Sequence, residues 1–240
     1  MCLRTMLRYN AEISESHIAA AAKKGRTMRC LSVEDARRAL AQPLPGAAAH
    51  AIMAPQPRPG WSVPSMPRDC RESGVLLLLF PRDGQLQFVL TRRTEQVHAH
   101  KGQVSLPGGG RLDGETLVVT AQRETFEELG VAPAAVEVLG DLSPLYVPVS
   151  NYCIYPLVGY QATVPALHPN ALEVANVQQV PLAALLAAQN RHGEYWNEPG
   201  FKNRRRIPCY RLGDWVVWGA TAMILSEMAM LLEPVAGEVS

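Results

Sequence analysis

Cysteine is scarce in this sequence and follows no ligand-like spacing. The five cysteines among 240 residues stand at positions 2, 30, 70, 153 and 209, and no two of them form a CxxC pair. This spacing argues against a zinc site, and an odd number of scattered cysteines is more typical of reduced thiols than of a disulfide scaffold. We therefore expect free thiols and a cytoplasmic protein.

Four further absences narrow the functional classes. The six histidines include no HExxH pair, and the net charge of +1 lacks the basic excess of a nucleic-acid-binding surface. No apolar run approaches the ~20 residues that cross a bilayer. The N-terminus mixes Arg4 and Arg8 with Glu12 and Glu15 and has no apolar segment of a secretory leader. We therefore expect neither a nucleic-acid partner nor a membrane partner.

Residues 1–70 are predicted to form an extension of short helices and irregular chain. Helical patterns cover residues 13–24 and 33–41, the second after Ser32, a residue type that caps helices. Residues 43–67 are rich in Pro, Ala and Gly without periodicity, which predicts an irregular connector. Three interpretations of the extension stay open: a flexible arm, an element exchanged within a homodimer, or an over-long start.

Residues 71–235 alternate between strand-like and helix-like patterns, and compact structure is expected to begin near Gly74. The apolar runs 75–80 and 86–91 flank Pro81–Gly84, a hairpin-like turn. Mixed strands and helices indicate an α/β domain. Further strands are predicted over 136–147, 152–160 and 207–212, a short helix over 181–189, and an apolar helix over 216–232 that covers one sheet face.

The most informative segment runs from residue 108 to residue 131. On a helix, residues four apart share a face, which brings Glu124 beside Glu128. Such like-charged pairs destabilise an isolated helix by roughly 0.2–0.5 kcal/mol each. The cluster therefore predicts a counter-charge, and its hard oxygen ligands suit Mg²⁺ or Mn²⁺. Its fixed positions are Gly108–Gly110, Glu115, Arg123, Glu124, Glu127, Glu128 and Gly130.

Local signals place this cluster on a helix that needs tertiary packing. Thr116 suits the N-cap, and Gly130 suits the left-handed position after the last turn. Residues 118–120 are β-branched and lower the helix propensity. A stripe to be buried recurs every four residues, at Leu117, Ala121, Thr125 and Leu129.

This spacing resembles the motif of the Nudix hydrolases, and every charged and glycine position of that motif is filled. The one departure is Thr125, where an aliphatic residue or Ala is usual; its hydroxyl can bond back to the preceding turn. The resemblance implies an α/β/α sandwich with a mixed β-sheet. It also implies metal-dependent hydrolysis of a diphosphate linked to some other moiety.

A second motif, just upstream, is similar to that of the coenzyme A pyrophosphatase branch of these enzymes, LLTxR[SA]-x3-R-x3-G-x3-FPGG. Thr94, His98 and Leu106 depart from it, and His98 removes a permanent charge and a bidentate phosphate donor. Later segments around Glu173 and Trp218 also look like this branch, so the resemblance covers roughly residues 75–230. The matching positions are Thr91, Arg93, Gly102, Pro107, Gly108 and Gly109.

From the shared helix face and the resemblance we assign roles to the acidic cluster. Glu124 and Glu128 are the expected inner ligands of Mg²⁺ or Mn²⁺, and Glu127 is expected to ligate a further ion or to act through water. Glu115 is expected to ligate through water or to support the helix. Arg123 is expected to hold the carboxylates by charge-assisted hydrogen bonds.

The remaining candidates contact substrate or move its protons. Arg93 is the candidate phosphate contact, while Gly108 and Gly109 let the main chain approach closely. The general base varies in this superfamily, so Glu127 within the helix and Glu173 on a later loop are both candidates. Simpler interpretations stay open: a solvated acidic face, a surface ion pair for Arg93, a solvated Glu173, and structural roles for His98 and His100.

The leading functional prediction is a hydrolase that splits coenzyme A or its thioesters into 3′,5′-ADP and 4′-phosphopantetheine. A second prediction keeps the chemistry and changes the substrate to ADP-ribose, a dinucleotide or a damaged nucleoside triphosphate. A third is a ligand sensor without turnover. Such sensors typically lose a motif carboxylate, whereas this chain keeps Glu115, Glu124, Glu127 and Glu128.

Overall fold

The computed structural model describes residues 30–55, 66–94, 102–196 and 205–237. The chain separates into two compact units, residues 1–30 and 31–240, and the fold below belongs to the second. The predicted helix over 13–24, together with His98, His100 and Lys101, lies outside the described residues.

The main sheet is mixed, as expected. Its central path is β3-β2-β1-β7-β5, with β4 against β1, β6 against β7 and β8 against β2. Strands β1 and β7 run parallel, and the other pairs are antiparallel. The bounds are β1 Arg71–Arg82, β2 Gln85–Arg93, β3 Val104–Ser105, β4 Gly108–Gly110, β5 Glu137–Asp141, β6 Leu145–Val147, β7 Tyr152–Tyr160 and β8 Val174–Pro181.

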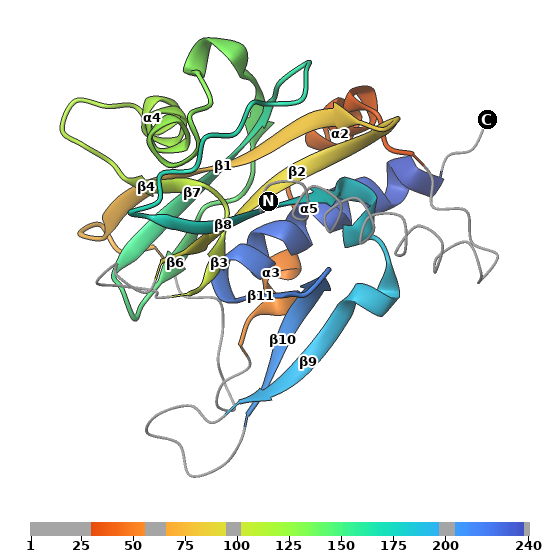
Figure 1. The fold of residues 1–240 in the computed structure, drawn as a ribbon. Coiled ribbons are helices and arrows are strands. Elements are labelled where there is room, and N and C mark those ends of the chain that lie inside the picture. Colours follow the sequence, from red (N-terminus) through yellow and green to blue (C-terminus); the bar gives the residue numbers. More distant parts are fainter. Residues whose placement is uncertain (1–29, 56–65, 95–101, 197–204, 238–240) are drawn as a thin grey trace, which may run out of the picture. The chain divides into compact units, whose positions relative to one another are not determined.

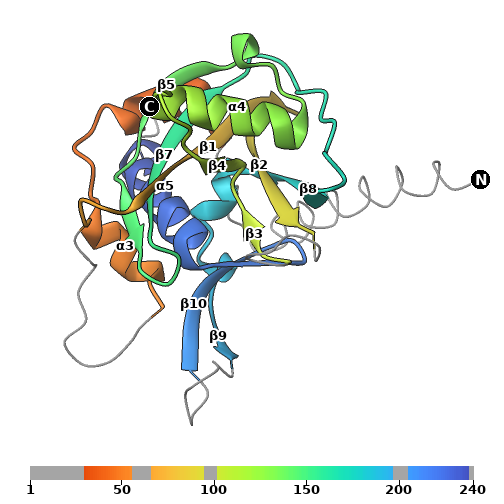
Figure 2. The same ribbon diagram turned by 90° about the vertical axis from the view of Figure 1, so that its left-hand side faces the viewer.

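Helices cover both faces of this sheet (Figures 1 and 2). Helix α4 (Leu117–Leu129) lies on one face, and α5 (Gly219–Gly237) lies on the other with α2 (Val33–Leu40) and α3 (Ala47–Met53). Successive side chains of β1 point to opposite faces: Leu76, Leu78 and Phe80 join the cluster beneath α4, whereas Leu77 and Leu79 join the core beneath α5. This two-sided burial explains the unbroken apolar run of β1 and confirms the α/β/α sandwich.

A second, three-stranded antiparallel sheet follows β8 in the chain. It has the order β11-β10-β9, with β9 at Arg191–Trp196, β10 at Arg205–Leu212 and β11 at Trp215–Trp218. The predicted start of the last helix at residue 216 is wrong, because the aromatic and β-branched residues 215–218 pair with β10. The predicted helix over 181–189 is instead two 3₁₀ turns, Leu182–Leu185 and Ala188–Asn190; a third, Pro133–Ala135, follows α4.

The N-terminal side of this unit differs from the predicted irregular extension. Helix α2 is confirmed, and Ser32 caps it: the Asp35 N–H donates to Ser32 Oγ at 3.2 Å, and the Ser32 N–H donates to Asp35 Oδ2 at 2.8 Å. The connector prediction for 43–67 is wrong where α3 forms, because Ala49 and Met53 are buried against the core. Helices α2 and α3 therefore belong to the same compact unit as the main sheet, residues 31–240.

Helix α5 also corrects the prediction about apolar runs. Gly219–Ala236 is long and apolar enough, by length and composition, to cross a membrane. In the fold, 61% of this window is buried, and its residues belong to the core beneath the main sheet. A helix that is apolar all round is expected where a sheet and other helices enclose it, so we interpret α5 as a core helix.

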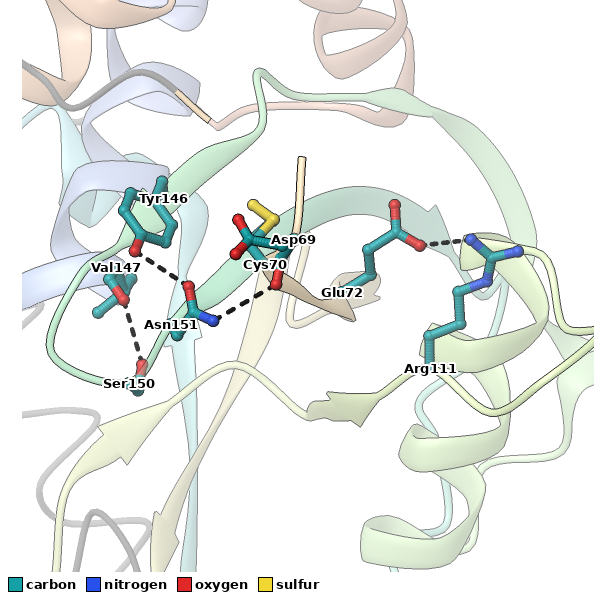
Figure 3. Close-up of a disulfide and its surroundings, with 9 residues drawn as sticks. Asp69, Cys70, Glu72, Arg111, Tyr146, Val147, Ser150 and Asn151 are labelled. Atoms are coloured by element: carbon teal, nitrogen blue, oxygen red, sulfur yellow. Dashed lines mark hydrogen bonds and ion pairs between the residues drawn. A yellow bond between two sulfur atoms is a disulfide. The ribbon is translucent and has the colours of Figure 1, made fainter. Parts of the chain in front are cut away.

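Two cysteines are paired, which contradicts the expectation of free thiols throughout. Cys70 and Cys153 form a disulfide with a Cα–Cα distance of 5.7 Å (Figure 3). The parallel pairing of β1 with β7 places Glu72 opposite Cys153, and the Arg71 N–H donates to Asn151 O at 2.8 Å. Because sheet register and not sequence spacing brings these cysteines together, counting cysteines could not find the bond. Cys30 and Cys209 are free.

Breaking this disulfide is expected to lower the free energy of unfolding by about 2–4 kcal/mol, because the bond closes a long loop in the unfolded chain. The two cysteines are 83 residues apart. The measurement is chemical denaturation of the Cys70→Ala/Cys153→Ala variant, with Cys30→Ser, which changes an exposed free thiol, as the control. Equal stability of wild type with and without dithiothreitol would contradict the expectation.

Candidate functional site

The acidic residues lie on α4, whose two ends are fixed as predicted. The Val119 N–H donates to Thr116 Oγ1 at 3.3 Å, and Gly130 has the left-handed φ of 73° while its N–H donates to Phe126 O at 2.8 Å. The Thr125 hydroxyl donates back to Ala121 O at 2.7 Å. Buried packing of Ala121 and Leu129 against the sheet then holds the helix.

Arg123 joins the acidic side chains to the glycine loop. Its guanidinium donates to Glu115 Oε1 (2.7 Å), Glu124 Oε1 (2.8 Å) and Glu127 Oε2 (3.1 Å), and to Gly110 O (3.0 Å). These bonds raise the pKa of Arg123, with the Glu115 bond as the largest cause. One fixed cation thus offsets the mutual repulsion of three carboxylates, which is the role predicted for it.

Glu115 supports the loop that leads into α4. Its carboxylate accepts hydrogen bonds from Arg123, from the Leu112 N–H at 3.1 Å and from the Thr120 hydroxyl at 2.8 Å. The Arg123 bond is the main reason that the pKa of Glu115 is lowered to about 2. These hydrogen bonds tie Glu115 to the start of α4 and to Arg123.

Glu124 lies directly against the glycine strand β4. A Cβ atom on Gly109 would come within 2.3 Å of the Glu124 carboxyl carbon, so a residue with a side chain cannot occupy position 109 without displacing this carboxylate. Burial raises the pKa of Glu124, and the hydrogen bond from Arg123 opposes that shift. Gly109 is therefore required for space rather than for an unusual backbone conformation.

Glu128 is the most buried of the acidic residues of α4, with 2% of its surface exposed. Burial raises the pKa of its carboxyl to about 8, although the Arg93 guanidinium, with Nη1 at 3.6 Å from Oε1, acts in the opposite direction. Its second oxygen, Oε2, is buried and has no hydrogen-bond partner among the described residues. A buried acceptor left in this state is costly, and it indicates a place for a ligand.

Glu173 approaches the same carboxylates from a separate loop. It precedes β8, and its negative charge contributes to the raised pKa of Glu124 and of Glu128, after burial as the main cause. The Thr94 N–H donates to Glu173 O at 2.9 Å, which fixes the loop to the end of β2. Glu173 and Arg93 therefore both lie near the carboxylates of α4.

The donor set fits a hard divalent cation. Glu124, Glu127 and Glu128 provide carboxylate oxygens, and the unpartnered Oε2 of Glu128 is a free ligand atom at the most buried point. Among the described residues, no three His, Cys, Asp or Glu side chains already stand in metal-binding geometry. Arg123 instead occupies Glu124 and Glu127, so cation binding would exchange these bonds for metal–oxygen contacts.

Sequence reasoning did not identify the residues that anchor these side chains. Arg111 donates to Glu115 O at 2.7 Å and pairs with Glu72 (Figure 3). Asn170 and Thr94 hold the loop that carries Glu173. No periodic or motif signal distinguishes them, apart from the departure at Thr94. A cavity of about 560 Å³ lies on the Arg111–Gly114 loop, and none of the carboxylates of α4 lines it.

Comparisons with known proteins agree on one domain. A model of the NUDIX domain matches residues 71–197. The chain is 34% identical over 174 residues to Nudix hydrolase 22, chloroplastic, of Arabidopsis thaliana, covering 68% of this chain and 55% of that protein. It is 33% identical over 164 residues to the Nudix hydrolase NudL of Photorhabdus laumondii, covering 68% and 86%.

Solved structures that are similar to this chain include a Nudix hydrolase from M. smegmatis, RenU. It is 17% identical, with a TM-score of 0.47, and the match covers 71% of this chain and 88% of that one. The chain spans only about half the length of the plant protein that it matches.

Proposed function

Because this chain belongs to the NUDIX domain family, we propose that it is a metal-dependent hydrolase of coenzyme A or its thioesters. The products are 3′,5′-ADP and 4′-phosphopantetheine or its acyl form. The observation that carries this proposal is the placement of the coenzyme A-type motif beside the acidic helix. Arg93 lies at the end of β2, with its Nη1 3.6 Å from Glu128 Oε1. The main-chain N–H of Arg93 donates to Gln103 O at 3.0 Å.

Other described residues of that motif join neighbouring strands of the main sheet. Thr91 pairs with Ser105 across β2 and β3, and the Leu76 N–H donates to Pro107 O at 2.9 Å. Gly108 then packs so tightly on β1 that a Cβ atom would lie 2.5 Å from Gly74 O. The glycine strand β4, which the two motifs share, is thus held against β1. On this proposal a diphosphate is held beside the acidic cluster for in-line attack.

The acidic residues divide into ligands and supports. Glu124, Glu127 and Glu128 would hold Mg²⁺ or Mn²⁺, which when bound neutralises diphosphate charge and lowers the pKa of water. Arg123 keeps these carboxylates on one side of α4, and Glu115 holds Arg123. Arg93, partly exposed beside Glu128, can turn to a phosphate oxygen with a two-pronged hydrogen bond.

Glu173 is the proposed general base. It stands on the loop before β8 and not on α4, so it can accept a proton from water while the carboxylates of α4 are engaged. Glu127 is the other candidate; its carboxylate accepts a hydrogen bond from Arg123 at 3.1 Å.

Product analysis tests the substrate. Purified protein with Mn²⁺ or Mg²⁺ is expected to release 3′,5′-ADP from coenzyme A, and EDTA is expected to stop the release. A parallel reaction with ADP-ribose measures AMP. Faster release of AMP than of 3′,5′-ADP would support the broader Nudix diphosphatase alternative, and tight binding without hydrolysis would support a sensor.

Metal binding is expected to release about one proton at pH 7, because Glu128 must lose its proton to become a ligand. Burial raises the pKa of this carboxyl to about 8, so it is mostly protonated at pH 7 before the cation arrives. Isothermal titration calorimetry with Mn²⁺, in buffers of different ionisation enthalpy, measures the number of protons released per bound cation. This number should fall well below one at pH 9. A proton release that does not change with pH would contradict the expectation.

A further inference from the structure

The loop that carries Glu173 is organised around one residue, Asn170, through its main chain and its side chain. The main-chain carbonyl of Asn170 accepts hydrogen bonds from the N–H groups of Glu173 (3.0 Å) and Val174 (2.8 Å). Its side-chain Oδ1 accepts a hydrogen bond from the Leu172 N–H at 3.1 Å. Its amide group then donates from Nδ2 to Glu173 Oε1 at 3.4 Å. Asn170 therefore fixes both the backbone and the carboxylate of Glu173.

The same residue is joined to the acidic helix. The Asn170 N–H donates to the carbonyl of Glu128 at 2.9 Å, and the His168 N–H donates to the carbonyl of Leu129 at 2.7 Å. These carbonyls belong to the last turn of α4, which has no helical partner for them. Asn170 thus links the most buried carboxylate of the site to the proposed base through a few covalent bonds and two hydrogen bonds.

A second anchor stops this loop from moving away. The Thr94 N–H donates to Glu173 O, and the Thr94 hydroxyl donates to Leu172 O at 3.0 Å. With the backbone held on both sides, the remaining freedom of Glu173 is the rotation of its own side chain. The amide of Asn170 is the hydrogen-bond donor that the structure gives to its carboxylate.

We propose that Asn170 is a positioning residue that aims the Glu173 carboxylate at the attacking water. This inference rests on the proposed function, in which Glu173 is the base. The 3.4 Å bond from Asn170 to Glu173 is long, as catalytic hydrogen bonds often are before substrate binds. A base held in one orientation loses less entropy on reaching the transition state, so Asn170 acts on turnover more than on substrate binding.

The test uses a double-mutant cycle. Asn170→Asp keeps the oxygen that accepts the Leu172 N–H and removes the donor to Glu173, so kcat should fall roughly 10-fold with KM and the Mn²⁺ dissociation constant within about 2-fold. Glu173→Gln should lower kcat by about 10²-fold or more. The double variant should match Glu173→Gln alone, because Asn170 acts only through that carboxylate.

A merely structural role would make kcat follow stability. In the double variant the amide introduced by Glu173→Gln can donate to the carboxylate introduced by Asn170→Asp, so thermal stability should return towards the wild-type value. The positioning role predicts that kcat does not return with it, because the Glu173 carboxylate is absent. Asn176→Asp, which adds the same charge at an exposed position of β8, is the matched control and should leave kcat unchanged. All variants are assayed on whichever diphosphate the wild type hydrolyses.

Four results would overturn the inference. Losses that multiply in the double variant would show that Asn170 acts elsewhere. A rise in KM at constant kcat would make it a binding residue. Full kcat in Glu173→Gln would remove the base itself, while the proposed function would still stand on the products of the wild type. Absence of hydrolysis of every diphosphate by the wild type would overturn both.

Discussion

Replacing Glu128 by glutamine is expected to lower diphosphate hydrolysis by about 10³-fold, the scale seen when one preorganised charged contact is lost from a site. Its Oε2 atom is buried without a partner among the described residues, and Oε1 faces Arg93. An amide keeps the shape of the side chain but removes the negative charge and turns one ligand atom into a donor. The affinity for the cation should therefore fall together with the turnover.

The same change should not destabilise the metal-free protein. The pKa of Glu128 is raised to about 8, from 4.5 in an unfolded chain. Between these values the folded state binds more protons than the unfolded state, so the contribution of Glu128 to stability falls as the pH rises from 4.5 to 8. Glutamine carries no such penalty. At pH 8 the variant should be at least as stable as the metal-free wild type.

Three measurements check this expectation. Turnover gives the catalytic loss, and Mn²⁺ titration gives the affinity for the cation. Denaturation without metal at pH 6 and pH 8 gives the pH dependence of the free energy of unfolding. Glu137→Gln, which removes an exposed carboxylate that pairs with Arg37 at 2.8 Å, is the control. A Glu128→Gln variant with turnover within tenfold of wild type would remove Glu128 from the ligand set.

Local signals predicted the elements that local chemistry decides. The apolar run from Val75 and the turn at Asp83–Gly84 predicted the β1–β2 hairpin, and both turn residues have positive φ. Thr116 and Gly130 predicted the two ends of α4. The four-residue spacing placed the carboxylates on one face. Each of these features depends on residues that are neighbours in the chain.

Features that depend on distant partners were missed. The Cys70–Cys153 disulfide follows from the parallel register of β1 and β7, which no spacing rule provides. Helix α3 is short, and it exists because Ala49 and Met53 find the core. Asn170 gains its place from the last turn of α4, more than 40 residues earlier in the sequence. In all three cases, tertiary contact outweighs propensity.

Replacing Glu227 by glutamine is expected to lower the free energy of unfolding by about 3–5 kcal/mol, the cost of breaking a buried charged interaction. Glu227 on α5 is fully buried, and each of its oxygens accepts a hydrogen bond. Oε1 accepts the Gly46 N–H at 2.9 Å; Oε2 accepts the Ser143 N–H at 2.9 Å and lies 3.3 Å from His50 Nε2. Whichever oxygen an amide replaces, a donor would face another donor.

The loss should depend on pH in a defined direction. Burial acts to raise the pKa of Glu227, but the hydrogen bonds from His50, Ser143 and Gly46 together lower it below 4.5. Its stabilising contribution is therefore present above pH 4.5 and disappears as the pH falls through the folded pKa. The difference between wild type and Glu227→Gln should narrow in acid.

Urea denaturation between pH 3.5 and pH 7.5 measures this difference. Glu233→Gln is the matched control, since Glu233 lies on the same helix but is half-exposed and pairs with Arg191 at 2.8 Å; its loss should be about 1 kcal/mol or less. Equal losses of unfolding free energy in the two variants would mean that the buried hydrogen bonds of Glu227 contribute no extra stability. A large, pH-dependent loss confined to Glu227 would show that α5 holds α3 and the chain before β6 through one carboxylate.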